Sequence, residues 1–381
     1  MPQTTLSTIS TPSLILDRDR MDRNIARLQG LMTEHGVVLR PHLKTAKSVD
    51  AARRLFPDGP GPITVSTLAE AEYFAKEGGF TDITWAVGLD PAKASRAARI
   101  KASGVDLKVT LDTVEQAAAL GEAGRHEGNC PAAFIEIDCD GHRGGIAPDD
   151  PLLIAVAQAL ADAQVPLAGV LTHAGESYGL NTADALAAAA EGERAAAVKA
   201  AENLRAAGFT CPIVSVGSTP TAHFAQDLTG VTEVRAGVFM FFDLVMHGVG
   251  VCQLHDLAIS VLATVIGRKP DKGWLLIDAG WMAMSRDRGT ANQPTDQGYG
   301  LACNIAGEPY DDLVIESASQ EHGILALRPG SKASLPDLPV GSRVRILPNH
   351  ACATGAQHTG YEVICNGSDE IAEHWPRMRG W

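Results

Sequence analysis

The sequence predicts an α/β protein in which a (β/α)8 barrel of the TIM type is followed by a mainly β domain. Eight short apolar runs rich in β-branched residues alternate with alanine-rich helical stretches between residues 37 and 239. After residue 255 long helical stretches largely disappear, and Gly, Pro and Asp turns divide strand-like segments. A doubly wound open sheet is the alternative, but it usually has fewer strands, and no GxGxxG fingerprint follows the first run.

The eight runs have the length of buried parallel strands, and helix candidates separate them. Eight repeats of such a βα unit are what a closed barrel requires. The expected strands are residues 37–42, 62–67, 82–87, 106–111, 132–137, 167–173, 212–217 and 232–239, and the expected helices include residues 21–35, 68–78, 151–163 and 182–208.

The second domain is expected to consist mainly of strands. Residues 257–267, 273–280, 342–350 and 360–367 are its strand-like segments. The segment SLILD at residues 13–17 precedes the first barrel helix and could join the same sheet. We therefore expect a barrel domain over residues 18–255 and a β domain formed by residues 1–17 and 256–381.

Composition limits the partners of the protein. Its formal net charge of −13 argues against nucleic acid and anionic membranes, because both require clustered cations. No apolar run reaches the roughly 18 residues of a membrane span. The first ten residues lack the charged and apolar regions of a secretory signal, so we expect a cytoplasmic protein. The seven cysteines include no CxxC pair, so neither a disulfide framework nor a zinc ribbon is indicated.

Polar residues after the predicted strands carry the functional information, because barrel enzymes place catalysis at the carboxyl ends of their strands. GSTPT at residues 217–221 is rich in hydroxyl and N–H donors and is expected to open a helix, which suits a phosphate. An ordinary βα turn with an N-cap is the alternative. Gly237 at the eighth strand favours the phosphate, because the loops after strands seven and eight commonly bind one. The other candidates are His42, Lys44, Asp138, Asp140, His142, Arg143, His173, Tyr178 and Arg235.

Lys44 follows the first strand, in the segment RPHLKTAKS at residues 40–48. A phosphate at strands seven and eight that faces a lysine from strand one suggests pyridoxal 5'-phosphate bound as a Schiff base. A buried lysine loses its proton readily, which makes the amine a nucleophile. Taken alone, Lys44 would be a solvated rim lysine, and spacing does not exclude Lys47 as a competitor.

Five segments together resemble one enzyme family: RPHLKTAKS, EIDCDGHRGG, LTHAGESY, VGSTPTA and VRAGVF. They are similar to the fold-type III pyridoxal-phosphate enzymes, in the branch with D-serine dehydratase, D-threo-3-hydroxyaspartate dehydratase and D-threonine aldolase. The resemblance implies an alanine-racemase-like barrel, a β domain and a homodimer. It also implies that Lys44 binds the cofactor, that Arg143 meets its phenolic oxygen and that His173 packs on the pyridine face. The residues that would surround the phosphate are Gly217, Ser218, Thr219 and Gly237, with Tyr178 nearby. Arg235 falls where racemases place an arginine at the pyridine nitrogen.

The segment LPNHACATGAQH at residues 347–358 carries a candidate metal pair. His350 and Cys352 are two residues apart at the end of a predicted strand, so both side chains would leave one face. Imidazole and thiolate suit Zn²⁺, with Mn²⁺, Co²⁺ or Mg²⁺ also possible. Alone, the pair would be a core cysteine beside a loop histidine, but the resemblance implies a metal bound by histidine and, two positions later, cysteine in dehydratases or aspartate in several aldolases. His322 resembles a segment near that metal, or is a loop histidine.

The resemblance implies a lyase that acts on β-hydroxy-D-amino acids. In β-elimination, Lys44 removes the α-proton and the metal-bound hydroxyl leaves, so D-threo-3-hydroxyaspartate or D-serine gives a 2-oxo acid and ammonia. In a retro-aldol reaction Cα–Cβ breaks and glycine and an aldehyde form. Cys352 favours elimination. A racemase would need a tyrosine base in the β domain, where Tyr299, Tyr310 and Tyr361 match no motif, and a non-enzymatic cofactor carrier would lack the second domain.

Overall fold

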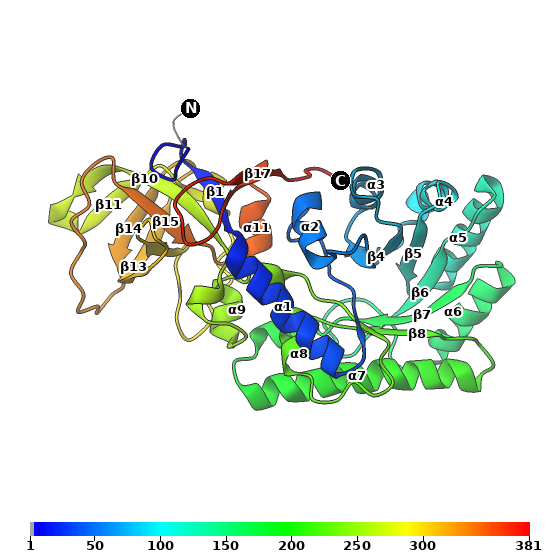
Figure 1. The fold of residues 1–381 in the computed structure, drawn as a ribbon. Coiled ribbons are helices and arrows are strands. Elements are labelled where there is room, and N and C mark those ends of the chain that lie inside the picture. Colours follow the sequence, from blue (N-terminus) through cyan, green and yellow to red (C-terminus); the bar gives the residue numbers. More distant parts are fainter. Residues whose placement is uncertain (1–3) are drawn as a thin grey trace. The chain divides into compact units, whose positions relative to one another are not determined.

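The computed structural model describes residues 4–381 and divides the chain into two compact units (Figure 1). The first, here the β unit, consists of residues up to Ala26 and of Val238–Arg379, and the second, the barrel unit, consists mainly of Arg27–Gly237. Residues 18–26 and 238–255 were predicted to belong to the barrel domain, but in this division they belong to the β unit. The second of these segments packs with the β unit, because the N–H groups of Leu244 and Val245 donate to carbonyls at residues 348 and 349.

The barrel unit contains eight parallel strands in the predicted order. Its sheet runs β2-β9-β8-β7-β6-β5-β4-β3, and a parallel bridge between His42 and Thr64 joins the two edges. All eight predicted strands and the predicted fold class are therefore confirmed. The strands are β2 (Val38–Leu39), β3 (Ile63–Val65), β4 (Asp82–Gly88), β5 (Asp106–Leu111), β6 (Ala132–Ile137), β7 (Leu167–Thr172), β8 (Ile213–Val216) and β9 (Glu233–Val234).

Helices follow the barrel strands, and threonines begin several of them. The side chains of Thr67, Thr113 and Thr182 each accept a hydrogen bond from an N–H in the first helical turn, which satisfies a donor that the helix cannot. The predicted helices are confirmed to within a few residues. The helices are α1 (Arg18–Glu34), which begins in the β unit, α2 (Val49–Leu55), α3 (Leu68–Gly78), α4 (Ala94–Ala102), α5 (Val114–Glu127), α6 (Pro151–Asp162), α7 (Ala183–Ala206) and α8 (Thr219–Phe224), with 3-10 turns η1 (Pro91–Lys93) and η2 (Gly175–Gly179).

The β unit is built on one sheet, in the order β11-β14-β13-β12-β15-β10-β1-β16-β17. Strand β10 also pairs with β11, so β10 to β15 form a closed ring. Strand β1 joins this sheet, as predicted, and lies between β10 and β16. Its elements are β1 (Ser13–Asp17), β10 (Ile259–Lys269), β11 (Trp274–Ile277), β12 (Leu301–Cys303), β13 (Pro309–Ala318), β14 (Gly323–Leu327), β15 (Arg343–Leu347), β16 (Gly360–Ile364), β17 (Glu373–Pro376), α9 (Leu244–Val249), α10 (Trp281–Met284), α11 (Ala351–Gly355), η3 (Val238–Met240), η4 (Leu254–Asp256) and η5 (Pro270–Lys272).

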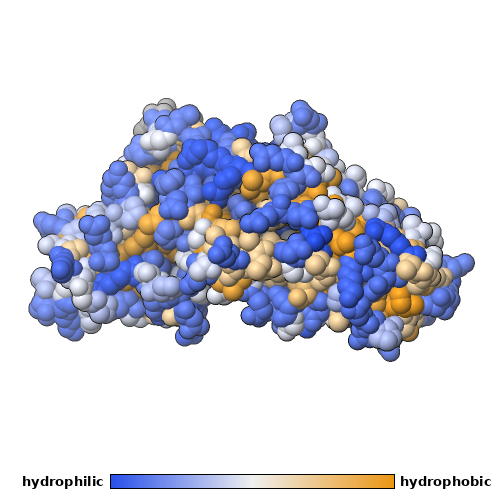
Figure 2. All heavy atoms as spheres, turned by 90° about the horizontal axis from the view of Figure 1, so that it is seen from below, coloured by the Kyte–Doolittle hydropathy of each residue, from blue (hydrophilic) through white to orange (hydrophobic). Residues whose placement is uncertain are grey.

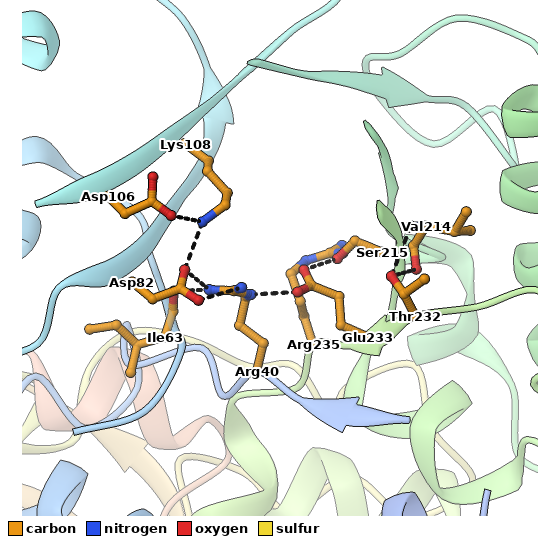
Figure 3. Close-up of polar contacts among 10 residues, drawn as sticks. All are labelled: Arg40, Ile63, Asp82, Asp106, Lys108, Val214, Ser215, Thr232, Glu233 and Arg235. Carbon is orange, nitrogen blue, oxygen red and sulfur yellow. Dashed lines mark hydrogen bonds and ion pairs between the residues drawn. The ribbon is translucent and has the colours of Figure 1, made fainter. Parts of the chain in front are cut away.

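Ion pairs connect the first residues of β4, β5 and β9 (Figure 3). Arg40 Nε donates to Glu233 Oε2 at 2.8 Å, and Arg40 Nη1 donates to Asp82 Oδ1 at 2.8 Å. Lys108 Nζ donates to Asp82 at 2.8 Å and to Asp106 at 2.7 Å. Arg40 and Glu233 are both buried, so each charge needs the other to offset its lost hydration. Because its three carboxylates, Asp82, Asp106 and Glu233, are the first residues of their strands, we assign this network to fold stability rather than to chemistry.

The surface alternates between hydrophilic and apolar residues. On the face in Figure 2 hydrophilic residues make up much of the surface, and apolar residues come between them. Among the helices of residues 4–381, none has both the length and the apolar character that crossing a bilayer requires. The most exposed large apolar side chains are spread along the sequence: Val38, Val87, Val114, Leu152, Ile266, Met282, Val340 and Trp381.

Candidate active site

The loop after β2 carries His42, Lys44 and Lys47. Lys44 is exposed in this chain. Burial lowers the pKa of His42 well below its ordinary value, and the charge of Lys44 is the next largest cause, so the two side chains lie close together. Lys47 is engaged elsewhere, since its Nζ lies 2.9 Å from Oε1 of the buried Glu70 in α3. Lys44 is therefore the lysine of this loop that faces the strand-end histidines.

His173, directly after β7, is held in one orientation. Its Nδ1 lies 2.9 Å from the carbonyl oxygen of Gly217 and donates to it, which leaves Nε2 as an acceptor. Burial, with smaller contributions from Lys44 and Arg143, lowers the pKa of His173 to about 3. Its ring centre is 6.2 Å from that of Tyr178. His173 is therefore a neutral, oriented ring that could pack on a planar cofactor.

The loop after β6 is shaped by its carboxylates. Asp138 Oδ1 accepts from the Gly141 N–H at 2.7 Å, and Asp140 Oδ2 accepts from the Glu176 N–H at 2.9 Å. His142 Nδ1 lies 2.7 Å from Glu176 Oε1. These bonds hold the loop against η2, which gives Asp138, Asp140 and His142 structural partners.

Arg143, in the same loop, keeps an exposed guanidinium. Its Nη2 is 4.0 Å from Glu136 Oε1 on β6, a long ion pair. Burial raises the pKa of Glu136, while Arg143 opposes this effect. The Arg143 guanidinium is therefore held loosely and is available to an anionic oxygen.

The turn at residues 217–221 begins a helix, as predicted, and its N-cap residue is also what the alternative of an ordinary βα turn requires. Ser218 caps α8: its Oγ accepts from the Thr221 N–H, and Thr221 Oγ1 accepts from the Ser218 N–H at 3.0 Å. Gly217 has φ +138°, and a Cβ there would lie 2.0 Å from a backbone oxygen of β9's neighbour Arg235. Thr219 Oγ1 is buried and has no hydrogen-bond partner within the described residues. A buried hydroxyl left without a partner fits an anionic group that binds there.

Gly237 lies beside the loop that carries Lys44. A Cβ at Gly237 would lie 2.8 Å from the carbonyl oxygen of His42 and 3.3 Å from Thr45 Oγ1, so any side chain here would press on that loop. The structure thus brings the end of β9 against the end of β2. The cofactor's proposed lysine and the eighth-strand glycine come from adjacent loops, as the barrel order predicts.

Arg235 points into the barrel (Figure 3). Its guanidinium donates to Ser215 Oγ. It also donates to the carbonyl oxygen of Thr172. Burial lowers the pKa of Arg235 to about 10, and nearby glutamates, Glu233 first, oppose this effect. Arg235 therefore stays charged at neutral pH. The charge of Arg235, like those of Lys44 and Arg143, helps burial to lower the pKa of His42. This cationic cluster in an acidic protein favours an anionic ligand.

The predicted metal pair lies in the β unit, but not on a strand. Strand β15 ends at Leu347, His350 is the N-cap of α11, and Cys352 lies in the first turn of that helix. The strand prediction is wrong because Pro348 lacks the N–H that a ladder needs and the chain turns into a helix. The two side chains nevertheless meet, since Cys352 hydrogen-bonds the His350 ring.

Two carboxylates flank this pair. His350 Nδ1 lies 2.7 Å from Asp287 Oδ2, and Asp243 Oδ2 accepts from the Ala351 N–H at 2.9 Å. Burial alone would lower the pKa of His350, but Asp287 and Cys352 raise it to about 11. In residues 4–381 no three His, Cys, Asp or Glu side chains form a metal cluster. One nitrogen, one sulfur and a carboxylate behind the imidazole fit a metal that completes its shell with water or substrate.

Two further candidates are a loop histidine and a tyrosine of the β unit. His322 is exposed between β13 and β14, and its backbone carbonyl accepts from the Ser319 N–H, as expected for a loop histidine. Tyr361 is buried, and burial raises its pKa to about 12. Such a tyrosine cannot reach solvent or ionise near neutral pH, which argues against it as a racemase base.

Comparison with known proteins agrees with this geometry. Residues 16–245 match the family model "Alanine racemase, N-terminal domain", and residues 258–364 match "Putative serine dehydratase domain". This chain belongs to the fold-type III pyridoxal-phosphate family. Within the family, it is 53% identical to D-threo-3-hydroxyaspartate dehydratase of Delftia sp. strain HT23 over 100% of both chains. The solved structure of that enzyme matches with a TM-score of 0.95, again over 100% of both chains.

Other members of the family are more distant. D-serine dehydratase of Dictyostelium discoideum is 28% identical over 99% of this chain and 98% of its own length. D-threonine aldolase of Arthrobacter sp. is 28% identical over 96% of this chain and 92% of its own length. The family relatives of this chain therefore include enzymes named for carbon–oxygen and for carbon–carbon bond cleavage.

Two residues of the site were missed in the sequence. Glu193, in α7, accepts from the N–H groups of Ala174 and Gly217, and Asp287 binds the His350 ring. Glu193 had a signal, because it occupies a position of the apolar stripe that α7 buries. Asp287 gave no such signal in the sequence, because carboxylates are common in polar loops.

Proposed function

We propose that the protein is a pyridoxal-phosphate-dependent and divalent-metal-dependent lyase that removes water from D-threo-3-hydroxyaspartate or D-serine. The products are a 2-oxo acid and ammonia. The proposal rests mainly on one observation: the neutral His173 is hydrogen-bonded to Gly217, in a turn whose Thr219 hydroxyl has no hydrogen-bond partner among residues 4–381. The 53% identity with D-threo-3-hydroxyaspartate dehydratase favours that substrate.

The residues of the barrel unit have distinct tasks in this proposal. Lys44 binds the cofactor and takes the proton from the substrate Cα, and Arg143 binds the phenolic oxygen. His173 packs on the pyridine ring as a neutral group. The phosphate is surrounded by Gly217, Ser218, Thr219, Gly237 and Tyr178.

The reaction breaks the Cα–H and Cβ–O bonds and releases water, and the enamine that forms is hydrolysed to a 2-oxo acid and ammonia. When bound, pyridoxal phosphate draws electrons from Cα and the metal acts as a Lewis acid on the β-hydroxyl. His350 and Cys352 would supply the protein ligands. A proton accepted by Lys44 makes its amine cationic, and the low pKa of His173 keeps that ring from competing for the proton.

The metal proposal has independent support in the Delftia enzyme. Its solved structures include a histidine-to-alanine mutant and a cysteine-to-alanine mutant in the metal-free form, at positions two residues apart. His350 and Cys352 have the same spacing. We favour Zn²⁺ for this nitrogen and sulfur pair, with Mn²⁺, Co²⁺ or Mg²⁺ as alternatives.

The alternative is an aldolase that cleaves D-threonine to glycine and an aldehyde. The similarity to D-threonine aldolase supports it, whereas cysteine at position 352 favours elimination. The resemblance also supports a homodimer, and the composition supports a cytoplasmic location. Light scattering of the purified protein tests the dimer.

A product assay tests the proposal. Purified protein is incubated with D-threo-3-hydroxyaspartate, D-serine and D-threonine, each with and without a chelator. We expect ammonia and a 2-oxo acid from at least one of the first two substrates, and loss of that activity after metal removal. Glycine plus aldehyde from D-threonine would establish the aldolase instead. Activity unaffected by thorough metal removal would sink the role of His350 and Cys352.

A further inference from the structure

Glu193 is a buried carboxylate that the proposed chemistry does not use. It lies in α7 on the face that the helix buries, among apolar neighbours such as Leu186, Ala190 and Ala197. Only 2% of Glu193 is exposed. An ionised carboxylate is costly to bury unless hydrogen bonds and an opposite charge compensate it, so its partners identify what it does.

The Glu193 carboxylate joins two loops of the site. Oε1 accepts from the Ala174 N–H at 2.8 Å and from the Gly217 N–H at 3.0 Å, and Oε2 accepts from Thr221 Oγ1 at 2.7 Å. Ala174 follows His173 after β7, whereas Gly217 and Thr221 belong to the turn after β8. One side chain thus fixes the spacing between the loop of the oriented histidine and the turn of the proposed phosphate site.

The same bonds fix both sides of the Gly217 residue. Its N–H donates to Glu193, and its carbonyl oxygen accepts from His173 Nδ1 at 2.9 Å. Thr221 Oγ1, which donates to Glu193, also accepts from the Ser218 N–H at 3.0 Å. The imidazole direction and the turn conformation therefore depend on one carboxylate.

Burial raises the pKa of Glu193, and its hydrogen-bond donors together with the charge of the buried Arg235 oppose this effect. Three donors occupy its two oxygens. This matters because an uncompensated carboxylate near a phosphate would weaken binding by repulsion. An ionised Glu193 accepts hydrogen bonds that are stronger than those that a neutral carboxyl group accepts.

We propose that Glu193 is the positioning residue of the cofactor site, because it holds the His173 loop and the 217–221 turn in the geometry that binds pyridoxal phosphate. The proposal rests on the proposed function, since it requires this site to bind that cofactor. Glu193 acts through its neighbours and does not itself contact the reacting atoms in this account.

The test compares Glu193→Gln with a matched control on the same helix. Gln keeps the length and shape of Glu193 but loses the charge and turns one acceptor into a donor. Glu191→Gln makes the same chemical change at an exposed position, where the carboxylate pairs only with Arg194 in the bonds described. Thr221→Val keeps the side-chain shape but removes one of the three donors to Glu193, together with the acceptor of the Ser218 N–H.

The measured quantity is the Kd of the folded full-length apoprotein for pyridoxal phosphate. It is obtained from the visible absorbance of the bound cofactor during titration. We expect the Kd of Glu193→Gln to rise roughly tenfold or more, since a charged hydrogen bond is lost, and that of Thr221→Val to rise several-fold. Glu191→Gln should bind like the wild type. Thermal unfolding of each apoprotein is the companion readout, because a merely structural role would lower its Tm and leave the Kd unchanged.

The outcomes separate the two proposals. If the wild type fails to bind pyridoxal phosphate, the proposed function is wrong. If the wild type binds and Glu193→Gln matches Glu191→Gln, or binds more tightly, the positioning role of Glu193 is overturned. If Glu193→Gln does not fold, Thr221→Val decides, and an unchanged Kd for that variant contradicts the proposal.

Discussion

Replacing Gly217 by alanine should damage the barrel unit and the cofactor site together. A Cβ at this position would lie 2.0 Å from the carbonyl oxygen of Arg235, where ordinary contacts begin at 3.4 Å. The segments that contain Gly217 and Arg235 cannot move apart without losing a hydrogen bond, because the Arg235 N–H donates to the Val216 carbonyl oxygen at 2.7 Å. The backbone at φ +138° adds strain of about 1–3 kcal/mol, and the overpacking adds about 1–3 kcal/mol.

These two effects together predict a loss of about 2–6 kcal/mol for Gly217→Ala. For a unit of this size the corresponding fall in Tm is roughly 4–24 °C, measured by thermal unfolding of the apoprotein. Gly179→Ala is the control, because a Cβ at Gly179 has no atom within 4 Å. The reasoning is refuted if Gly217→Ala unfolds at the wild-type temperature and binds pyridoxal phosphate with wild-type affinity.

Three further predictions concern single side chains. Lys44→Ala should abolish the borohydride-reducible cofactor adduct, whereas Lys47→Ala should retain it; the reverse result would move the Schiff base to Lys47. His350→Ala and Cys352→Ser should each lower bound metal, measured by elemental analysis after dialysis at fixed free metal, and full retention in both would remove the site from residues 350–352. Burial lowers the pKa of His173 to about 3, so between about pH 6.5 and about pH 3 the folded protein binds fewer protons than the unfolded chain. The free energy of unfolding should therefore fall as the pH drops through that range. Ring NMR should find His173 neutral at about pH 5, and a protonated ring there would contradict the assignment.

The barrel could be predicted because each of its strands is a separate apolar run with a helix behind it. Residues 132–137 were predicted as a strand and form one with the same bounds. In the β unit, β12, β13, β14 and β17 were not predicted. β12 and β17 have only three and four residues, which leave no periodic pattern, and β13 begins with the polar run PYDD, which does not resemble a strand.

The candidate site divides along similar lines. His173, Gly217 and Thr219 follow strands directly, so the barrel order places them together. The exposure of Lys44 and the helical position of Cys352 depend on how loops pack, which sequence spacing does not report. Glu193 reaches the site from the middle of a helix, and only the three-dimensional structure shows that its carboxylate ends at two loops.

The most direct test of the central claim is the product balance from D-threo-3-hydroxyaspartate alone. Elimination of water gives oxaloacetate and ammonia in equal amounts, whereas retro-aldol cleavage of the same substrate gives glycine and glyoxylate. We predict equal amounts of oxaloacetate and ammonia, formed by the metal-loaded protein and absent with Lys44→Ala. Glycine and glyoxylate as the main products would contradict the assignment as a dehydratase.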